Sequence, residues 1–279
     1  MGIEFNRDHD TGVGKGRIAA AMIVWAKKNG KIPVFVTEKH GLYGDMYRDL
    51  VNIGHGDIKI NMTNAAEAFI DDLEGNRVLT ASASDARRTV DSLRKDAKLP
   101  GDVLFTTYTQ FDGDVNGSNR RDALRNLVRT GNALLIFDES HNGAGESARN
   151  EFLMEVLTGV GLFKDDNGNV LAPPSDWVPP PTMYSSATFS KRSANMPLYA
   201  RTDLIYPADN DPAKLKEIFL NNNRLTQVAS EMLVESGQMI RLERSYAGIE
   251  PKWTIDNDNQ AIVKGCIDQK WPKTRGYVQ

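Results

Sequence analysis

Short apolar runs of strand length recur along the chain, and polar or mixed stretches separate them. Residues 32–37 (IPVFVT) and 133–138 (ALLIFD) are the clearest of these runs. Nearly every position in them is apolar, which is typical of strands that are buried on both faces of a parallel sheet. Residues 102–107 and 183–186 predict two further strands. Weaker strand predictions are residues 3–7, 57–60, 77–81, 238–242 and 253–255.

Between these runs, apolar residues recur at the spacing of an α-helix. Residues 18–26 (IAAAMIVWA) are apolar on every face, as expected for a helix buried against a sheet. Further helices are predicted over residues 42–51, 85–97, 119–129 and 148–160. Asp211 and Pro212 are typical of a helix start, and one apolar stripe follows them as far as Leu233.

Residues 163–181 contain the sequence DDNGN and five prolines, which predicts a loop. Strands and helices alternate along the rest of the chain. The sequence therefore predicts an α/β fold with a mainly parallel sheet sandwiched between helices.

The composition is that of an ordinary globular protein, with 279 residues, of which 40% are hydrophobic and 25% charged. The net charge of −3 argues against a basic protein that wraps nucleic acid, although it allows a local basic groove. Cys266 is the only cysteine, which excludes an internal disulfide and a cysteine-cluster zinc site. No apolar run approaches the ~20 residues of a membrane span, and no signal peptide is visible. We therefore expect an intracellular, cytoplasmic protein.

Residues 9–17, with the sequence HDTGVGKGR, carry the strongest chemical signal. Gly12, Gly14 and Gly16 allow backbone angles that a side chain forbids, and Gly16 adjoins the predicted helix. Successive N–H groups and the positive end of the helix dipole then point at one spot, which suits an anion. Lys15 is placed to reach that anion. A turn of this kind is typical of a site for the phosphates of a nucleotide.

The spacing of this turn departs from the strict phosphate-loop pattern. G-x-x-x-x-G-K-[ST] requires a glycine at position 9 and a hydroxyl at position 16, where this chain has His9 and Gly16. A looser form, G-x-G-K, is present from Gly12 to Lys15. The alternative is a glycine-rich turn at a helix start with an exposed lysine. The turn begins within ten residues of Met1, as expected of a fragment or of an unusually clipped gene product.

A second signal, Asp138-Glu139-Ser140-His141, follows the strand 133–138 directly. Ligand sites of parallel sheets lie beyond the carboxyl ends of the strands. Transfer of a phosphoryl group to water needs one group that holds Mg²⁺ and another that orients or deprotonates the water. Asp138 suits the first role and Glu139 the second. The alternative is that the acidic pair merely begins a polar loop.

The remaining signals are weaker. Ser186-Ala187-Thr188 stands at a predicted strand end, where hydroxyls can bond to a neighbouring carboxylate. A basic stretch could meet phosphates, but it is more typical of a solvated helix face; it comprises Arg87, Arg88, Arg94, Lys95 and Lys98. The four histidines have no metal-ligand spacing, and no G-x-S-x-G nucleophile turn occurs.

Taken together, HDTGVGKGR, LLIFDESH and YSSAT resemble motifs I, II and III of superfamily 2 helicases, in the same order. The chain is more closely similar to the strawberry notch family of helicase-like proteins. That resemblance rests on the glycine turn, on DESH and on several further segments: 42–54 (LYGDMYRDLVNIG), 105–108 (FTTY), 186–188 with 195–196, and 245–250 (SYAGIE). It spans most of residues 8–250.

The resemblance implies a RecA-like first motor domain over residues 1–250, followed by a tail at 251–279. It implies binding of ATP with Mg²⁺ and contact with DNA or RNA. The nucleotide-binding residues that it implies are Thr11, Gly12, Val13, Gly14, Lys15, Gly16 and Arg17. Asp138 would bind the metal, and Glu139 and Lys15 would be the catalytic residues. Ser186, Thr188 and His141 would couple hydrolysis to movement, and Thr37, Lys39, Thr106 and Thr107 would meet a nucleic-acid strand.

Two departures from the resemblance change the expectation. Gly16 replaces the hydroxyl that usually binds Mg²⁺, so the metal would depend on Asp138 and water. No second motor domain is recognisable, and an arginine finger of the kind that completes such sites contributes ~10³–10⁵ in rate. We therefore expect weak hydrolysis unless a partner chain or further sequence completes the site. The alternative function is a nucleotide-dependent interaction module with negligible turnover; a P-loop kinase or transferase is disfavoured.

Overall fold

The computed structural model describes residues 2–6, 14–64, 69–72, 74–112, 115–143, 148–186, 193–220 and 223–241. All of them belong to one unit of the chain, which ends at Glu243. The predicted strand 253–255 and the segment 245–250 lie outside the described residues. The division into a domain of residues 1–250 and a tail therefore stays a prediction.

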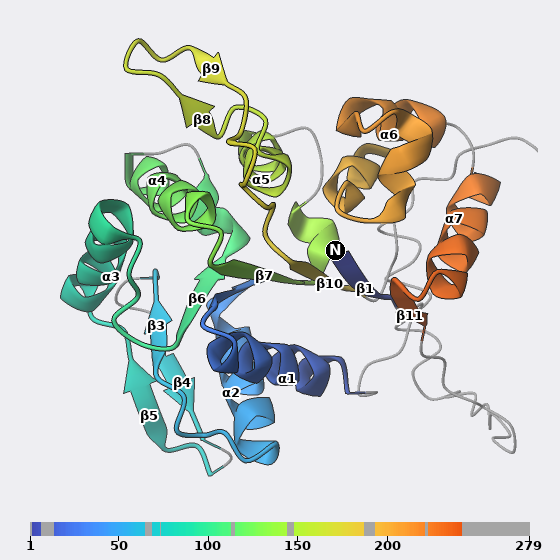
Figure 1. The fold of residues 1–279 in the computed structure, drawn as a ribbon. Coiled ribbons are helices and arrows are strands. Elements are labelled where there is room, and N and C mark those ends of the chain that lie inside the picture. Colours follow the sequence, from blue (N-terminus) through green and yellow to red (C-terminus); the bar gives the residue numbers. More distant parts are fainter. Residues whose placement is uncertain are drawn as a thin grey trace, which may run out of the picture. The chain divides into compact units, whose positions relative to one another are not determined.

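A seven-stranded sheet forms the centre of this unit, in the order β11-β1-β10-β7-β2-β6-β3 (Figure 1). Its strands are β1 (Gly2–Asn6), β2 (Ile32–Thr37), β3 (Ile60–Met62), β6 (Val103–Thr107), β7 (Ala133–Asp138), β10 (Thr182–Ser186) and β11 (Met239–Arg241). Every neighbouring pair is parallel. The carboxyl ends of all seven strands therefore lie at one edge of the sheet, and the predicted parallel α/β fold is confirmed.

Helices cover both faces of the sheet (Figure 1). On one face lie α1 (Lys15–Lys28) and α2 (Tyr43–Asn52); on the other lie α3 (Ala83–Asp96), α4 (Val115–Arg129) and α5 (Ala148–Thr158). Side chains alternate between the two cores along the central strands. In β2, for example, Val34 and Val36 pack with α3, α4 and α5, whereas Phe35 packs with α1 and α2. Because both faces are covered, the strands are apolar at almost every position.

Shorter elements complete the unit. The described residues include five 3₁₀ helices: η1 (His40–Leu42), η2 (Tyr108–Phe111), η3 (Ser140–Gly143), η4 (Ser193–Tyr199) and η5 (Asp203–Ala208). They also include two further α-helices, α6 (Pro212–Ile218) and α7 (Asn223–Glu235). Two small antiparallel hairpins stand apart from the main sheet: β4 (Phe69–Asp71) with β5 (Arg77–Thr80), and β8 (Phe163–Lys164) with β9 (Val170–Leu171).

Several predicted elements differ from the observed ones. The strand predicted at 57–60 is β3, which begins only at Ile60. The run at 77–81 does form a strand, but its largely exposed residues pair with β4 instead of entering the main sheet. The loop predicted at 163–181 contains β8 and β9, whose turn is held by the Asp165 carboxylate accepting N–H bonds from Asn167 and Asn169. The stripe after Pro212 belongs to two helices, α6 and α7.

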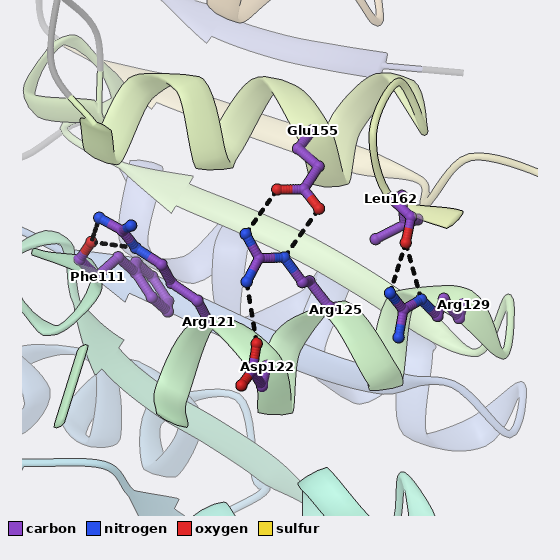
Figure 2. A network of polar contacts seen from close by, with 7 residues as sticks. All are labelled: Phe111, Arg121, Asp122, Arg125, Arg129, Glu155 and Leu162. Atoms are coloured by element: carbon purple, nitrogen blue, oxygen red, sulfur yellow. Dashed lines mark hydrogen bonds and ion pairs between the residues drawn. The ribbon is translucent and has the colours of Figure 1, made fainter. Parts of the chain in front are cut away.

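One face of α4 carries three arginines at intervals of four residues, so they project in the same direction (Figure 2). Arg125 forms two parallel hydrogen bonds with the Glu155 carboxylate of α5, at 2.8 and 2.7 Å. Arg121 donates to the carbonyl of Phe111, and Arg129 donates to the carbonyl of Leu162. These contacts tie α4 to η2, to α5 and to the chain that leaves α5.

Candidate functional site

The candidate site lies at the carboxyl edge of the sheet, where β2, β7 and β10 end beside one another. The register pairs Val36 with Phe137 and Ser185 with Asp138, so the three strands end at nearly the same level. Parallel α/β sheets bind ligands beyond this edge. Here the side chains of Thr37, Asp138 and Ser186 are therefore brought together from segments that are far apart in the sequence.

Lys15, in the first turn of α1, reaches the same edge. Its Nζ lies 3.2 Å from Glu139 Oε1 in an ion pair that is partly shielded from solvent. Helix α1 begins three residues earlier than predicted, because Gly14 is its N-cap, with φ of +91°, a value that favours glycine. Lys15 and the acidic pair are thus adjacent in space, as the sequence predicts.

Asp138 ends β7 with its carboxylate turned toward β2. Thr37 Oγ1 donates a hydrogen bond to Asp138 Oδ2 at 3.1 Å. Burial raises the pKa of Asp138, and the neighbouring Glu139 carboxylate adds to the increase, whereas the Thr37 hydrogen bond and the charge of Lys15 oppose it. The site therefore holds a desolvated carboxylate that would gain from a nearby cation.

Glu139 has a backbone φ of +46°, which is uncommon for a residue with a side chain. Glu139 lies between the end of β7 and the start of η3. Glu139 Oε1 faces Lys15, while Glu139 Oε2 lies 3.4 Å from His141 Nδ1. His141 Nδ1 also lies 3.0 Å from Ser186 Oγ at the end of β10. A chain of polar contacts thus runs from Lys15 through Glu139 and His141 to Ser186.

Two tyrosines that the sequence analysis did not single out as site residues brace this segment. Tyr108 is buried and donates a hydrogen bond from its hydroxyl to the backbone carbonyl of Asp138 at 3.0 Å. Tyr199 lies with its hydroxyl 3.4 Å from Ser140 Oγ. Both come from 3₁₀ helices that pack beyond the strand ends, and such long-range contacts leave no local pattern in the sequence.

The four residues expected to meet nucleic acid have different surroundings. Thr37, Thr106 and Thr107 are buried. Thr106 Oγ1 lies 2.7 Å from Thr63 Oγ1, and Thr107 Oγ1 accepts from the Asn64 amide at 3.3 Å. Of the four, Lys39 is exposed, with its Nζ 3.6 Å from Glu38 Oε1. In this conformation the three threonine side chains hold the strand ends together, and their contact with nucleic acid stays a prediction.

The other predicted site residues are only partly described. Thr11, Gly12, Val13 and Thr188 lie outside the described residues. Gly16 and Arg17 belong to the first turn of α1, and Arg17 is exposed. Their roles toward a nucleotide stay predictions.

The donor set fits a nucleotide with Mg²⁺. Lys15 offers a cation beside a helix N-terminus, which suits phosphate. Mg²⁺ in nucleotide sites is usually held by one or two carboxylates together with phosphate oxygens, and Asp138 is a carboxylate of this kind. Within the described residues, no group of three or more His, Cys, Asp or Glu side chains is placed to hold a metal by itself.

Comparison with known proteins adds family information. The family described as "P-loop containing NTP hydrolase pore-1" matches residues 5–252. No curated protein matches the chain. Among solved structures, a chain described as "XPD_Helicase" is similar at 18% identity and a TM-score of 0.31, covering 57% of this chain. The match spans 34% of that helicase, about a third of its length. None of the helices in the described ranges is long and apolar enough to cross a membrane.

Proposed function

Because the chain belongs to the P-loop containing NTP hydrolase pore-1 family and has its α/β RecA-like fold, we propose that it is the ATP-binding motor domain of a superfamily 2 helicase-like protein. We assign it to the strawberry notch family on the motifs of its sequence. It binds ATP with Mg²⁺, hydrolyses it slowly by itself, and couples nucleotide binding to contact with DNA or RNA.

One observation carries the proposal: Lys15 Nζ lies 3.2 Å from Glu139 Oε1. The two residues are 124 positions apart, and they come from the two segments with the strongest chemical signals. A shared phosphate site requires this proximity, since the lysine must face the γ-phosphate while the carboxylate next to it faces the attacking water.

Each site residue has its own role in this proposal. Lys15 exchanges its Glu139 partner for phosphate oxygens when a nucleotide binds, and this exchange frees the Glu139 carboxylate. Glu139 then orients the water and accepts its proton. Asp138 holds Mg²⁺, which when bound offsets the negative charge of the phosphates. His141 contacts both Glu139 and Ser186, so a change at Glu139 is transmitted to the end of β10.

This assignment implies that a second motor domain completes the site, either in a partner chain or in further sequence. The arginine that such a domain contributes stabilises charge in the transition state. For this chain alone we therefore expect measurable ATP affinity and a low rate of hydrolysis.

The test is to measure ATP binding and hydrolysis by the full chain, with and without single-stranded DNA or RNA. We expect nucleic acid to increase the rate, and Glu139→Gln to abolish the increase while retaining ATP binding. Lys15→Ala is the matched variant that loses binding itself. Absence of ATP binding by the unaltered protein would refute the proposal. ATP binding without hydrolysis under any condition would instead favour the nucleotide-dependent interaction module.

A further inference from the structure

A carboxylate lies where the side chain of residue 16 would stand. A Cβ placed on Gly16 would be 1.9 Å from Asp49 Oδ2 and 3.0 Å from Asp49 Cγ. Asp49 belongs to α2, which packs beside α1 on the same face of the sheet. Any residue other than glycine at position 16 would have to displace this carboxylate. The glycine therefore allows α2 to bring an acidic group against the first turn of α1.

Position 16 is the place at which the strict phosphate-loop pattern has its hydroxyl, and that hydroxyl binds Mg²⁺. Gly16 has no side-chain oxygen to offer. The Oδ2 atom of Asp49, however, lies little more than a bond length from where the missing Cβ would be. An oxygen of a different helix thus occupies the space that a side chain at position 16 would take.

The charged side chains around Asp49 include Arg48, Arg17 and Asp45. Gly16 directly follows Lys15, whose Nζ reaches the acidic pair at the end of β7. A carboxylate this close to bound phosphates would be repelled unless a cation stood between them. Mg²⁺ is a hard cation that takes one or two carboxylates together with phosphate oxygens.

We propose that Asp49 supplies the Mg²⁺ ligand that Gly16 cannot supply, and that Asp49 and Asp138 are the two carboxylates of the metal site. This inference rests on the proposed nucleotide site. The competing explanation is structural: a carboxylate near a helix N-terminus also stabilises the helix through its dipole. The N-cap of α1 is Gly14, which has no side chain to accept hydrogen bonds from the N–H groups of the first turn.

The two explanations differ in what happens when Asp49 loses its charge. The experiment titrates the full chain with a fluorescent ADP analogue, with and without Mg²⁺, and takes the ratio of the two affinities. For the unaltered protein we expect Mg²⁺ to strengthen binding. Asp49→Asn should reduce this strengthening by about tenfold or more, while binding without Mg²⁺ is unchanged or tighter. Asp45→Asn is the matched control, because it removes an exposed carboxylate from the same helix.

A second variant makes the test independent of how well Asp49→Asn folds. Gly16→Ser combined with Asp49→Ala restores an oxygen at position 16 after removing the carboxylate that would collide with it. We expect the combination to recover most of the Mg²⁺ effect that Asp49→Ala alone loses.

The outcomes separate the two proposals. If the unaltered protein binds the analogue more tightly with Mg²⁺ and Asp49→Asn does so equally, Asp49 is not a ligand, even if its melting temperature falls. Binding that is insensitive to Mg²⁺ in the unaltered protein overturns this inference and the assignment of Asp138 to Mg²⁺, but it leaves the nucleotide site in place. If the unaltered protein binds no nucleotide in either condition, the proposed function fails, and this inference fails with it.

Discussion

The ion pair between Arg125 and Glu155 leads to a quantitative expectation for stability. The two side chains are 23% and 14% exposed, and Arg125 also contacts Asp122 Oδ1 at 3.0 Å (Figure 2). Hydrogen bonds to Glu155 raise the pKa of Arg125 above its ordinary value, so the guanidinium stays charged at neutral pH. Glu155→Gln would leave a largely buried guanidinium without its main counter-charge.

The expected size follows from the degree of burial. Breaking a fully buried ion pair by removing one partner costs about 3–5 kcal/mol, whereas an exposed pair contributes about 0–1 kcal/mol. For this mostly buried pair, with two parallel hydrogen bonds, we expect a loss of about 2 kcal/mol in the free energy of unfolding. A domain of this size would melt about 4–8 °C lower.

The assay is denaturant unfolding of Glu155→Gln, Arg125→Met and the double variant, followed by circular dichroism. The double variant should cost less than the sum of the two single changes, because neither Arg125 nor Glu155 is left facing a missing partner. Asp112→Asn is the control. It weakens another two-pronged arginine contact, that of Arg149, but Asp112 is 51% exposed, and we expect a change below about 1 kcal/mol. If Glu155→Gln cost no more than Asp112→Asn, the reasoning from burial would be refuted.

Two further predictions concern the site. Because burial and Glu139 raise the pKa of Asp138 in the folded state, the ionised carboxylate destabilises the nucleotide-free protein. Asp138→Asn should therefore increase the free energy of unfolding at pH 7 and lose Mg²⁺-dependent nucleotide binding. Its stability advantage should shrink as the pH falls toward the pKa of an unfolded aspartate, and a constant advantage across that range would contradict the assignment. Gly143→Ala would place a Cβ 2.8 Å from Tyr108 Cε1 and 3.1 Å from Leu153 Cδ1. We expect it to lower stability by about 1–3 kcal/mol, while Gly41→Ala, with no atom within 4 Å, changes it little; equal melting curves for the two variants would disprove this.

The pattern of apolar residues determined much of the fold. Residues 32–37 and 133–138 were predicted as strands with the bounds that β2 and β7 have, because buried parallel strands are apolar on both faces. Positions of β3 and β5 were harder to predict. Both are short and less apolar, and whether such a run joins the main sheet depends on partners that lie elsewhere in the chain.

The sequence by itself also indicated Lys15, Asp138 and Glu139 as candidate site residues, since a glycine-rich turn and an acidic pair after a buried strand are local patterns. Only the tertiary structure decided which groups meet them. The contacts of Tyr108 with the Asp138 carbonyl and of Asp49 with Gly16 join separate elements. Periodicity along one segment reports which face of that segment is buried, but not which distant side chain packs against it. For that reason the candidate residues Lys15, Asp138 and Glu139 could be predicted, whereas the residues that pack against them could not.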